Sequence, residues 1–165
     1  MSRDPPRQPP PRLTPPLRAL LDLHLDAARE IGLDPIVTYT KRTFAEQQAL
    51  FAQGRSPLAD VNALRATAGL PPITAKANQK VVSWTQKSKH LPGPDGLAEA
   101  YDLALRQPSG ISWDPHQDGN HNFEPDWNEL AKVAEGLSLP TGERLQAGLR
   151  FGDACHFQLK RPKTT

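Results

Sequence analysis

Apolar residues recur at helical spacing in two stretches of the chain, one near the beginning and one in the last third. A proline lies near the start of each stretch, and a glycine, Gly32 or Gly136, ends it. These boundaries are typical of helices. The pattern therefore predicts amphipathic helices over about 15–31 and 125–136. The two apolar stripes consist of Leu17, Leu20, Leu21, His24, Ala28 and Ile31, and of Trp127, Leu130, Ala131 and Ala134.

Short apolar runs between and after these helices predict strands. The sequence Thr43-x-x-Glu46 is a capping box for a further helix that ends near Gly54, and a short helix is expected around 60–68. The order of elements predicts an α+β fold, with a single domain in which helices pack on one side of an antiparallel sheet. The predicted strands are 35–39, 80–84, 97–105, 148–151 and 156–159.

Length and composition indicate one domain with a core of its own. The chain has 165 residues, of which 37% are hydrophobic. Residues 1–13 are rich in proline and arginine, so we expect them to be disordered. The domain is predicted over 14–161, followed by a flexible tail over 162–165. The segment 55–80 carries no recognisable chemistry and is expected to form a surface excursion.

The charge balance argues against a nucleic-acid partner. The chain contains 20 Lys and Arg and 18 acidic residues, which gives a net charge of +2. No nucleic-acid recognition motif is present. Cys155 is the single cysteine, so an intramolecular disulfide is excluded. Because neighbouring residues of a strand point to opposite faces, Cys155 is interpreted as a packed small residue and not as a ligand beside His156.

No apolar run is long enough to span a membrane, so no membrane anchor is expected. The first six residues, Met-Ser-Arg-Asp-Pro-Pro, lack the apolar core of a secretory signal peptide. We therefore expect synthesis in the cytoplasm.

His90, Asp102 and His156 offer two imidazoles and one carboxylate, a set that binds catalytic zinc and leaves its fourth position open. Asp153, three residues before His156, is a second carboxylate suited to proton transfer. The alternative is that these residues are structural, because such a set also arises by chance. His24 lies on an apolar stripe and is interpreted as packing.

The strings Ser88-Lys89-His90, Ala100-Tyr101-Asp102 and Asp153-x-x-His156 resemble the signature of zinc peptidases that cut peptidoglycan stem peptides. That family includes phage endolysins with L-alanyl-D-glutamate peptidase activity and D-alanyl-D-alanine carboxypeptidases. The stretch 39–47 is similar to the family's early arginine-containing segment, and the resemblance covers about 17–160. The loop 92–95 makes the spacing from His90 to Asp102 longer than in the shortest members.

The resemblance implies a Zn²⁺ ion held by His90, Asp102 and His156, with Asp153 as general base and then acid. It also places Arg42 at the active site, where a guanidinium suits substrate carboxylates or an oxyanion; otherwise Arg42 is an exposed turn residue. Ser88 either caps its turn or forms a hydrogen bond near the metal and substrate.

The function that the resemblance implies is hydrolysis of the L-alanyl-D-glutamate bond by a monomeric phage endolysin. Its partner would be the peptidoglycan stem peptide, and a holin would release the enzyme to the wall for host lysis. The alternatives are a D-alanyl-D-alanine carboxypeptidase and a wall-binding module with a structural metal. His116 and His121 lie in a polar segment, 116–122, that also suggests a second, weaker metal hypothesis.

Overall fold

The computed structural model describes residues 13–39, 42–83, 88–93 and 95–163. Within these ranges the chain forms two compact units. The sheet unit comprises the described residues up to 39 and those from 99 onward, and the helical unit comprises those between 42 and 98. Residues 1–12 and 164–165, where disorder and a flexible tail are predicted, lie outside the described residues.

Antiparallel pairing builds the sheet, which confirms the predicted α+β class. Its main path runs β1-β2-β5-β4, and β3 pairs with the last part of β2. The strands are β1 (Pro35–Tyr39), β2 (Ala100–Gln107), β3 (Gly110–Ser112), β4 (Arg144–Ala147) and β5 (His156–Lys160). Asp102 lies directly opposite His156, and Arg144 lies directly opposite Lys160.

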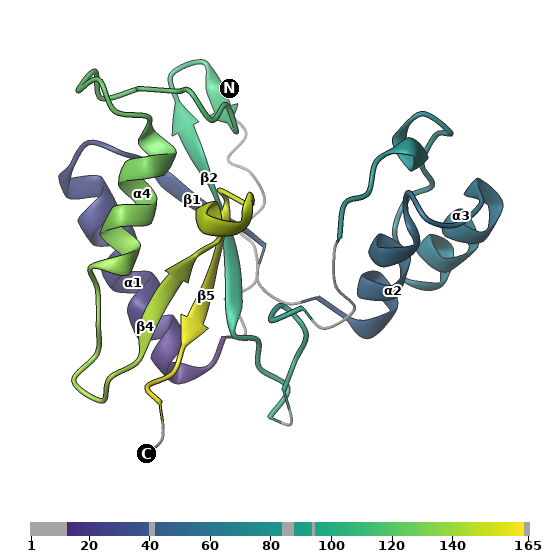
Figure 1. Ribbon diagram of the computed structural model, residues 1–165, viewed down its shortest axis with the longest axis horizontal. Coiled ribbons are helices and arrows are strands. Elements are labelled where there is room, and N and C mark those ends of the chain that lie inside the picture. Colours follow the sequence, from purple (N-terminus) through teal and green to yellow (C-terminus); the bar gives the residue numbers. More distant parts are fainter. Residues whose placement is uncertain (1–12, 40–41, 84–87, 94, 164–165) are drawn as a thin grey trace, which may run out of the picture. The chain divides into compact units, whose positions relative to one another are not determined.

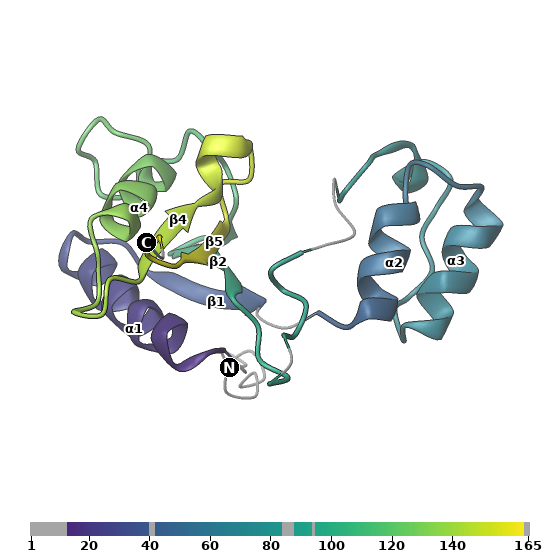
Figure 2. The same ribbon diagram turned by 60° about the horizontal axis from the view of Figure 1, so that its bottom comes forward.

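One face of the sheet is apolar and is covered by two helices, α1 (Pro15–Glu30) and α4 (Asp126–Glu135). Both helices lie on the same side of the strands in Figures 1 and 2. This arrangement confirms the predicted packing of helices on one side. Strand alternation directs the remaining side chains, Asp102 and His156 among them, to the opposite face. The buried apolar side chains of the covered face are Tyr101, Leu103, Leu105, Leu145, Ala147, Phe157 and Leu159.

His24 joins α1 to the sheet, as its predicted packing role requires. Its side chain is 0% exposed, and its ring lies edge-on to that of Phe157 at 4.7 Å between centroids. Nε2 lies 3.0 Å from the carbonyl oxygen of Leu130, which can only accept, so Nε2 carries the proton. Nδ1 then accepts from the hydroxyl of Tyr101 at 2.8 Å.

The helical unit contains α2 (Phe44–Ala52), α3 (Leu58–Thr67) and a single 3₁₀ turn, η1 (Ala77–Gln79). The predicted cap is present, because the Thr43 hydroxyl accepts from the backbone N–H of Glu46 at 3.1 Å. Gly54 follows α2 with a φ of +82°, and a Cβ there would lie 2.7 Å from the backbone nitrogen of Val81. Glycine therefore allows residues 80–81 to pass close to the end of α2.

Two strand predictions are wrong within the described chain. Residues 80–83 form no strand, because the Ser83 carbonyl accepts from the Arg55 guanidinium at 2.8 Å and its hydroxyl accepts from Gln47. Trp84 lies outside the described residues. Gly148–Phe151 is a 3₁₀ turn, η2, whose first carbonyl accepts from the N–H of Asp153. The strand β4 directly before it was not predicted.

In the described residues, no helix is both long and apolar enough to cross a membrane.

Candidate functional site

Asp102 and His156 form a close polar pair on the face of the sheet that α1 and α4 leave uncovered. The two residues are direct partners across β2 and β5. His156 Nδ1 lies 3.3 Å from Asp102 Oδ1, and the two side chains are only 10% and 19% exposed. Adjacent nitrogen and oxygen donors of this kind fit a zinc ion, which both ligand types bind at about 2.0–2.2 Å.

Gln158 fixes the orientation of the His156 ring. His156 Nε2 lies 3.0 Å from Gln158 Oε1, and Gln158 in turn donates from Nε2 to Gln146 Oε1 at 2.9 Å. An amide oxygen only accepts, so Nε2 of the ring carries a proton. In the neutral ring, Nδ1, on the side of Asp102, then has the lone pair that a metal requires. Histidine ligands in zinc sites are commonly oriented by such a hydrogen bond from the other nitrogen.

The surroundings of His156 favour positive charge in this region. Burial alone would lower the pKa of His156, but hydrogen bonds to Asp102 and Gln158 and the negative charges of Asp102 and Asp153 raise it above the usual value. Two carboxylates and an imidazole therefore act on one small region, and a cation is the species that their field stabilises.

Asp153 lies in the turn that leads into β5. Its backbone N–H donates to the carbonyl of Gly148 at 2.9 Å, and its own carbonyl accepts from the N–H of His156 at 3.2 Å. The residue is exposed, and its charge reaches His156. The carboxylate therefore combines contact with solvent and proximity to the Asp102–His156 pair, as a proton-transfer group requires.

Gly148 holds this turn against the first residue of β5. A Cβ at Gly148 would lie 2.3 Å from the carbonyl oxygen of Asp153 and 2.9 Å from Cβ of His156. Only glycine leaves room for this approach, so the backbone of η2 sets the position of both Asp153 and His156.

Cys155 is half-buried beside the same turn. Its thiol donates to Asp153 Oδ1 at 3.2 Å. Burial raises the pKa of the thiol, and the charges of Asp102 and Asp153 raise it further. A neutral thiol is a poor metal ligand, which agrees with its interpretation as a packed residue.

The helical unit contains the other three predicted site residues. His90 is buried at 2% exposure, its carbonyl accepts from the N–H of Arg42 at 2.8 Å, and its N–H donates to the Ser88 hydroxyl at 3.2 Å. The turn-capping role of Ser88 is therefore confirmed, and its role toward substrate stays a prediction. Arg42 is half-buried and donates from Nη1 to Gln47 Oε1 at 2.7 Å.

Gln47 in the helical unit and Gln158 in the sheet unit contact predicted site residues of their own unit, and neither was named in the sequence analysis. Gln47 is 2% exposed and connects the Arg42 guanidinium to the Ser83 hydroxyl. Gln47 lies in the apolar face of α2, so no sequence pattern indicates that its side chain makes polar contacts. Gln158 was detectable, because in a strand it shares a face with His156 two residues earlier.

The segment with His116 and His121 has no regular secondary structure, and both histidines are exposed. Its aspartates accept from nearby backbone N–H groups, Asp114 from that of His116 and Asp118 from those of Asn122 and Phe123. Among the described residues, neither histidine belongs to a group of three side chains arranged to hold a metal. The geometry gives the second metal hypothesis no support.

The chain is similar to a peptidoglycan L-alanyl-D-glutamate endopeptidase, CwlK of Bacillus subtilis (strain 168). The two are 30% identical over 134 residues, which cover 81% of this chain and 65% of CwlK. The chain thus spans slightly less than two thirds of the length of that relative. No protein-family model matches it. The similarity to CwlK supports the resemblance to peptidoglycan peptidases.

Proposed function

We propose that this protein is a zinc-dependent peptidase that hydrolyses the L-alanyl-D-glutamate bond of peptidoglycan stem peptides. The observation that carries the proposal is the Asp102–His156 pair with its Gln158 support, in a chain similar to CwlK. CwlK is named for cleavage of this bond, and the proposal extends its activity to this chain.

His90, Asp102 and His156 are the proposed zinc ligands. Each offers one nitrogen or oxygen atom to a metal, and both histidines are buried. Asp102 and His156 contribute from paired strands, and His90 contributes from a turn whose backbone is bonded to Ser88 and Arg42. When bound, zinc would polarise the scissile carbonyl and lower the pKa of water toward about 7.

Asp153 is the proposed general base and acid. Its exposed carboxylate accepts a proton from the attacking water and then donates that proton to the departing amine. Asp153 lies outside the proposed ligand set, so its role is proton transfer. The hydrogen bond from Cys155 helps to hold the carboxylate in place.

Arg42 is proposed to stabilise negative charge on the substrate or on the developing oxyanion. Gln47 holds its guanidinium through Nη1, which reduces the side-chain entropy lost on binding an anion. Ser88 is proposed to contact substrate near His90. Its bond to the His90 N–H uses a lone pair of the hydroxyl oxygen, and the hydroxyl proton can still donate.

Digestion of purified peptidoglycan tests the bond specificity. The expected products carry new alanine carboxyl and glutamate amino termini, while the glycan strands stay intact. Free D-alanine as the only product would instead establish the D-alanyl-D-alanine carboxypeptidase. New reducing sugars would reject both peptidases, and binding without cleavage would indicate a wall-binding module.

Elemental analysis tests the metal set separately. The protein is expected to bind about one zinc per chain and to lose activity in a strong chelator. His90→Ala and His156→Ala should lose the metal, whereas His116→Ala and His121→Ala should keep it. Full activity of the zinc-free protein would refute the mechanism.

The resemblance also supports a role as a phage endolysin in host lysis. Expression in a susceptible bacterium with and without a holin tests this role. Lysis only when both proteins are made is expected, and lysis without the holin would contradict the proposed release route. The monomeric state and the lack of a nucleic-acid partner stay predictions.

A further inference from the structure

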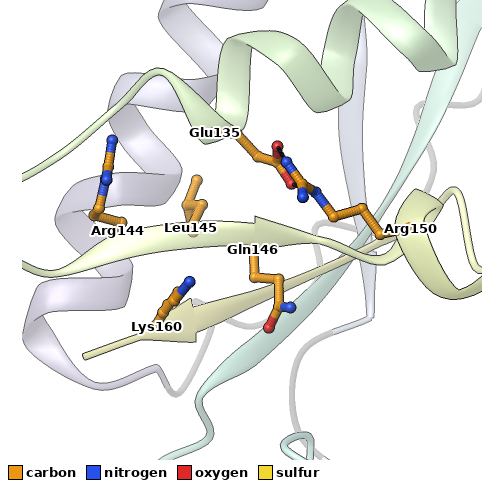
Figure 3. A pocket seen from close by; sticks show the side chains of 6 residues that line it. All are labelled: Glu135, Arg144, Leu145, Gln146, Arg150 and Lys160. Atoms are coloured by element: carbon orange, nitrogen blue, oxygen red, sulfur yellow. Dashed lines mark hydrogen bonds and ion pairs between the residues drawn. The ribbon is translucent and has the colours of Figure 1, made fainter. Parts of the chain in front are cut away.

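A pocket of about 220 Å³ lies at the outer edge of the sheet, along β4, where Arg144 also forms an isolated bridge with Ser138. Figure 3 shows its lining side chains, which come from α4, β4, η2 and β5. They carry three cations and one carboxylate, so the pocket has a net positive charge. Its lining residues are Glu135, Arg144, Leu145, Gln146, Arg150 and Lys160.

One of the three cations is already neutralised. Arg150 donates from Nε and Nη2 to the two carboxylate oxygens of Glu135, at 2.7 and 2.6 Å. Figure 3 shows this guanidinium against the carboxylate. The bidentate geometry commits both groups to each other. Arg144 and Lys160 remain. Both are exposed and neither forms an ion pair with an acid that the structure describes, while the charge of Lys160 contributes to the lowered pKa of Glu135.

Arg144 and Lys160 are direct partners in the antiparallel ladder of β4 and β5. Direct partners project from the same face of a sheet, and like charges in this position repel each other. No described residue of the protein relieves this repulsion by an ion pair. An anion bound between the two side chains would relieve it.

The cationic pair stands at the end of a polar row that starts at the candidate metal ligands. From Arg144 and Lys160 the row continues through Gln146 and Gln158, which are also ladder partners and are joined by a hydrogen bond of 2.9 Å. Gln158 then accepts from His156 at 3.0 Å. The row lies on one face because its members alternate along β4 and β5.

We propose that Arg144 and Lys160 form a subsite for a carboxylate of the stem peptide, on the same strand as His156. This inference rests on the proposed function and adds the direction of the bound substrate. Lys160 follows His156 by four residues, which corresponds to about 13 Å along a strand. An extended peptide with its scissile bond near His156 thus brings a carboxylate about four residues away to the cationic pair.

Two stem peptides test the subsite, one ending in a free carboxylate and one with that carboxylate amidated. Equilibrium binding to the zinc-loaded protein and the kinetics of cleavage are measured for both. The double variant Arg144→Gln/Lys160→Gln should bind the free acid roughly tenfold more weakly. It should bind the amide as the unchanged protein does, with kcat unaltered. The unchanged protein should prefer the acid to the amide by the same factor.

The variant Arg18→Gln/Arg29→Gln is the matched control, because it removes the same charge from exposed positions on α1. An equal loss of affinity in this control would reduce the effect to net charge and overturn the subsite. Cleavage of both peptides with equal KM would overturn the subsite and leave the proposed function standing. Preferred binding of the acid without cleavage would overturn the function and leave the subsite standing.

A phosphate polymer of the wall is the other anion to test. The carboxylate assignment would be overturned by one combination of results. The Arg144→Gln/Lys160→Gln variant would lose binding of poly(glycerol phosphate) and would bind the stem peptide as the unchanged protein does.

Discussion

His24 and His156 are both buried histidines, and their hydrogen-bond partners give them opposite protonation behaviour. Burial of His24 lowers its pKa to about 4, because its partners, a hydroxyl and a carbonyl, are neutral. His156 is bonded to Asp102, and its pKa is raised in spite of burial. Burial therefore does not separate a structural histidine from a candidate ligand, whereas a carboxylate partner does.

Asp153→Asn is expected to keep zinc and the fold while turnover falls by roughly a hundredfold or more, because the amide cannot accept the proton. Zinc content and kcat measured on the same preparation check this outcome. Glu99→Gln is the matched control, since Glu99 already forms an ion pair with Arg161, and it should retain most activity. Near-full activity of Asp153→Asn with zinc bound would remove Asp153 from the mechanism.

Gly148→Ala is expected to weaken zinc binding by roughly tenfold, as changes to residues that position a ligand commonly do. The new methyl group would meet the Asp153 carbonyl at 2.3 Å and Cβ of His156 at 2.9 Å, so the start of β5 must shift. A zinc titration against a competing chelator measures the change.

Gly136→Ala provides the comparison for this glycine. Its added Cβ would lie no nearer than 3.4 Å to another atom, in right-handed backbone at the end of α4. Unchanged zinc affinity is expected there. Equal affinities in both variants would show that Gly148 does not position His156.

At the level of elements, predictions succeeded where one pattern persisted over several turns. The apolar stripes that define α1 and α4 follow a helical period over several turns, and their residues are buried in the structure except Ile31, which follows the end of α1 and is 39% exposed. The four residues of β4 are too short a segment for a pattern. Leu149 and Phe151 give the sequence the alternating apolar pattern of a strand. In the structure they are 36% and 54% exposed in η2, where Gly148 starts a tight turn.

The candidate site could be predicted from the sequence in its residues but not in its geometry. Asp102 and His156 are 54 residues apart, and only the register of β2 and β5 makes them neighbours. That register depends on which faces of two distant strands are apolar. Strand alternation also predicts that Gln158 lies on the same face as His156. No pattern predicts the role of Gln47, because it is a polar residue on the buried side of α2.

Thr43→Ala tests whether the predicted cap stabilises α2. Loss of the hydroxyl leaves the N–H of Glu46 without its acceptor, and the free energy of unfolding should fall by about 1 kcal/mol. Thr67→Ala is the control, because the hydroxyl of Thr67 bonds to a carbonyl within α3 and caps no N–H. Urea unfolding of both variants measures the difference, and equal losses would contradict the cap.

At the scale of the whole molecule, protonation of His24 connects stability to pH. In the unfolded chain His24 takes up a proton at its ordinary pKa of 6.5, whereas in the folded chain its pKa is about 4. A lowered folded pKa means that acid favours the unfolded state. The stability that neutral His24 provides is complete above 6.5 and is lost as the pH falls from there toward 4.

The other described groups with a shifted pKa contribute to the pH dependence of stability mainly outside the range from pH 6.5 to 4.5. The raised pKa of His156 gives a contribution that is fully present below 6.5 and disappears only at higher pH. The lowered pKa values of Glu135 and Glu143 act below their ordinary value of 4.5. Among the described groups with a shifted pKa, His24 alone therefore governs the slope of stability between pH 6.5 and 4.5.

Urea unfolding in chelator at pH 6.5, 5.5 and 4.5 should show a loss of about 2 kcal/mol by pH 4.5. His24→Gln is expected to flatten this slope, because an amide supplies a donor for the Leu130 carbonyl and an acceptor for the Tyr101 hydroxyl without titrating. The absolute stability of the variant does not enter the comparison, since only the slopes are compared. An equally steep loss in His24→Gln would assign the acid sensitivity to another group and would contradict a neutral His24 in the core.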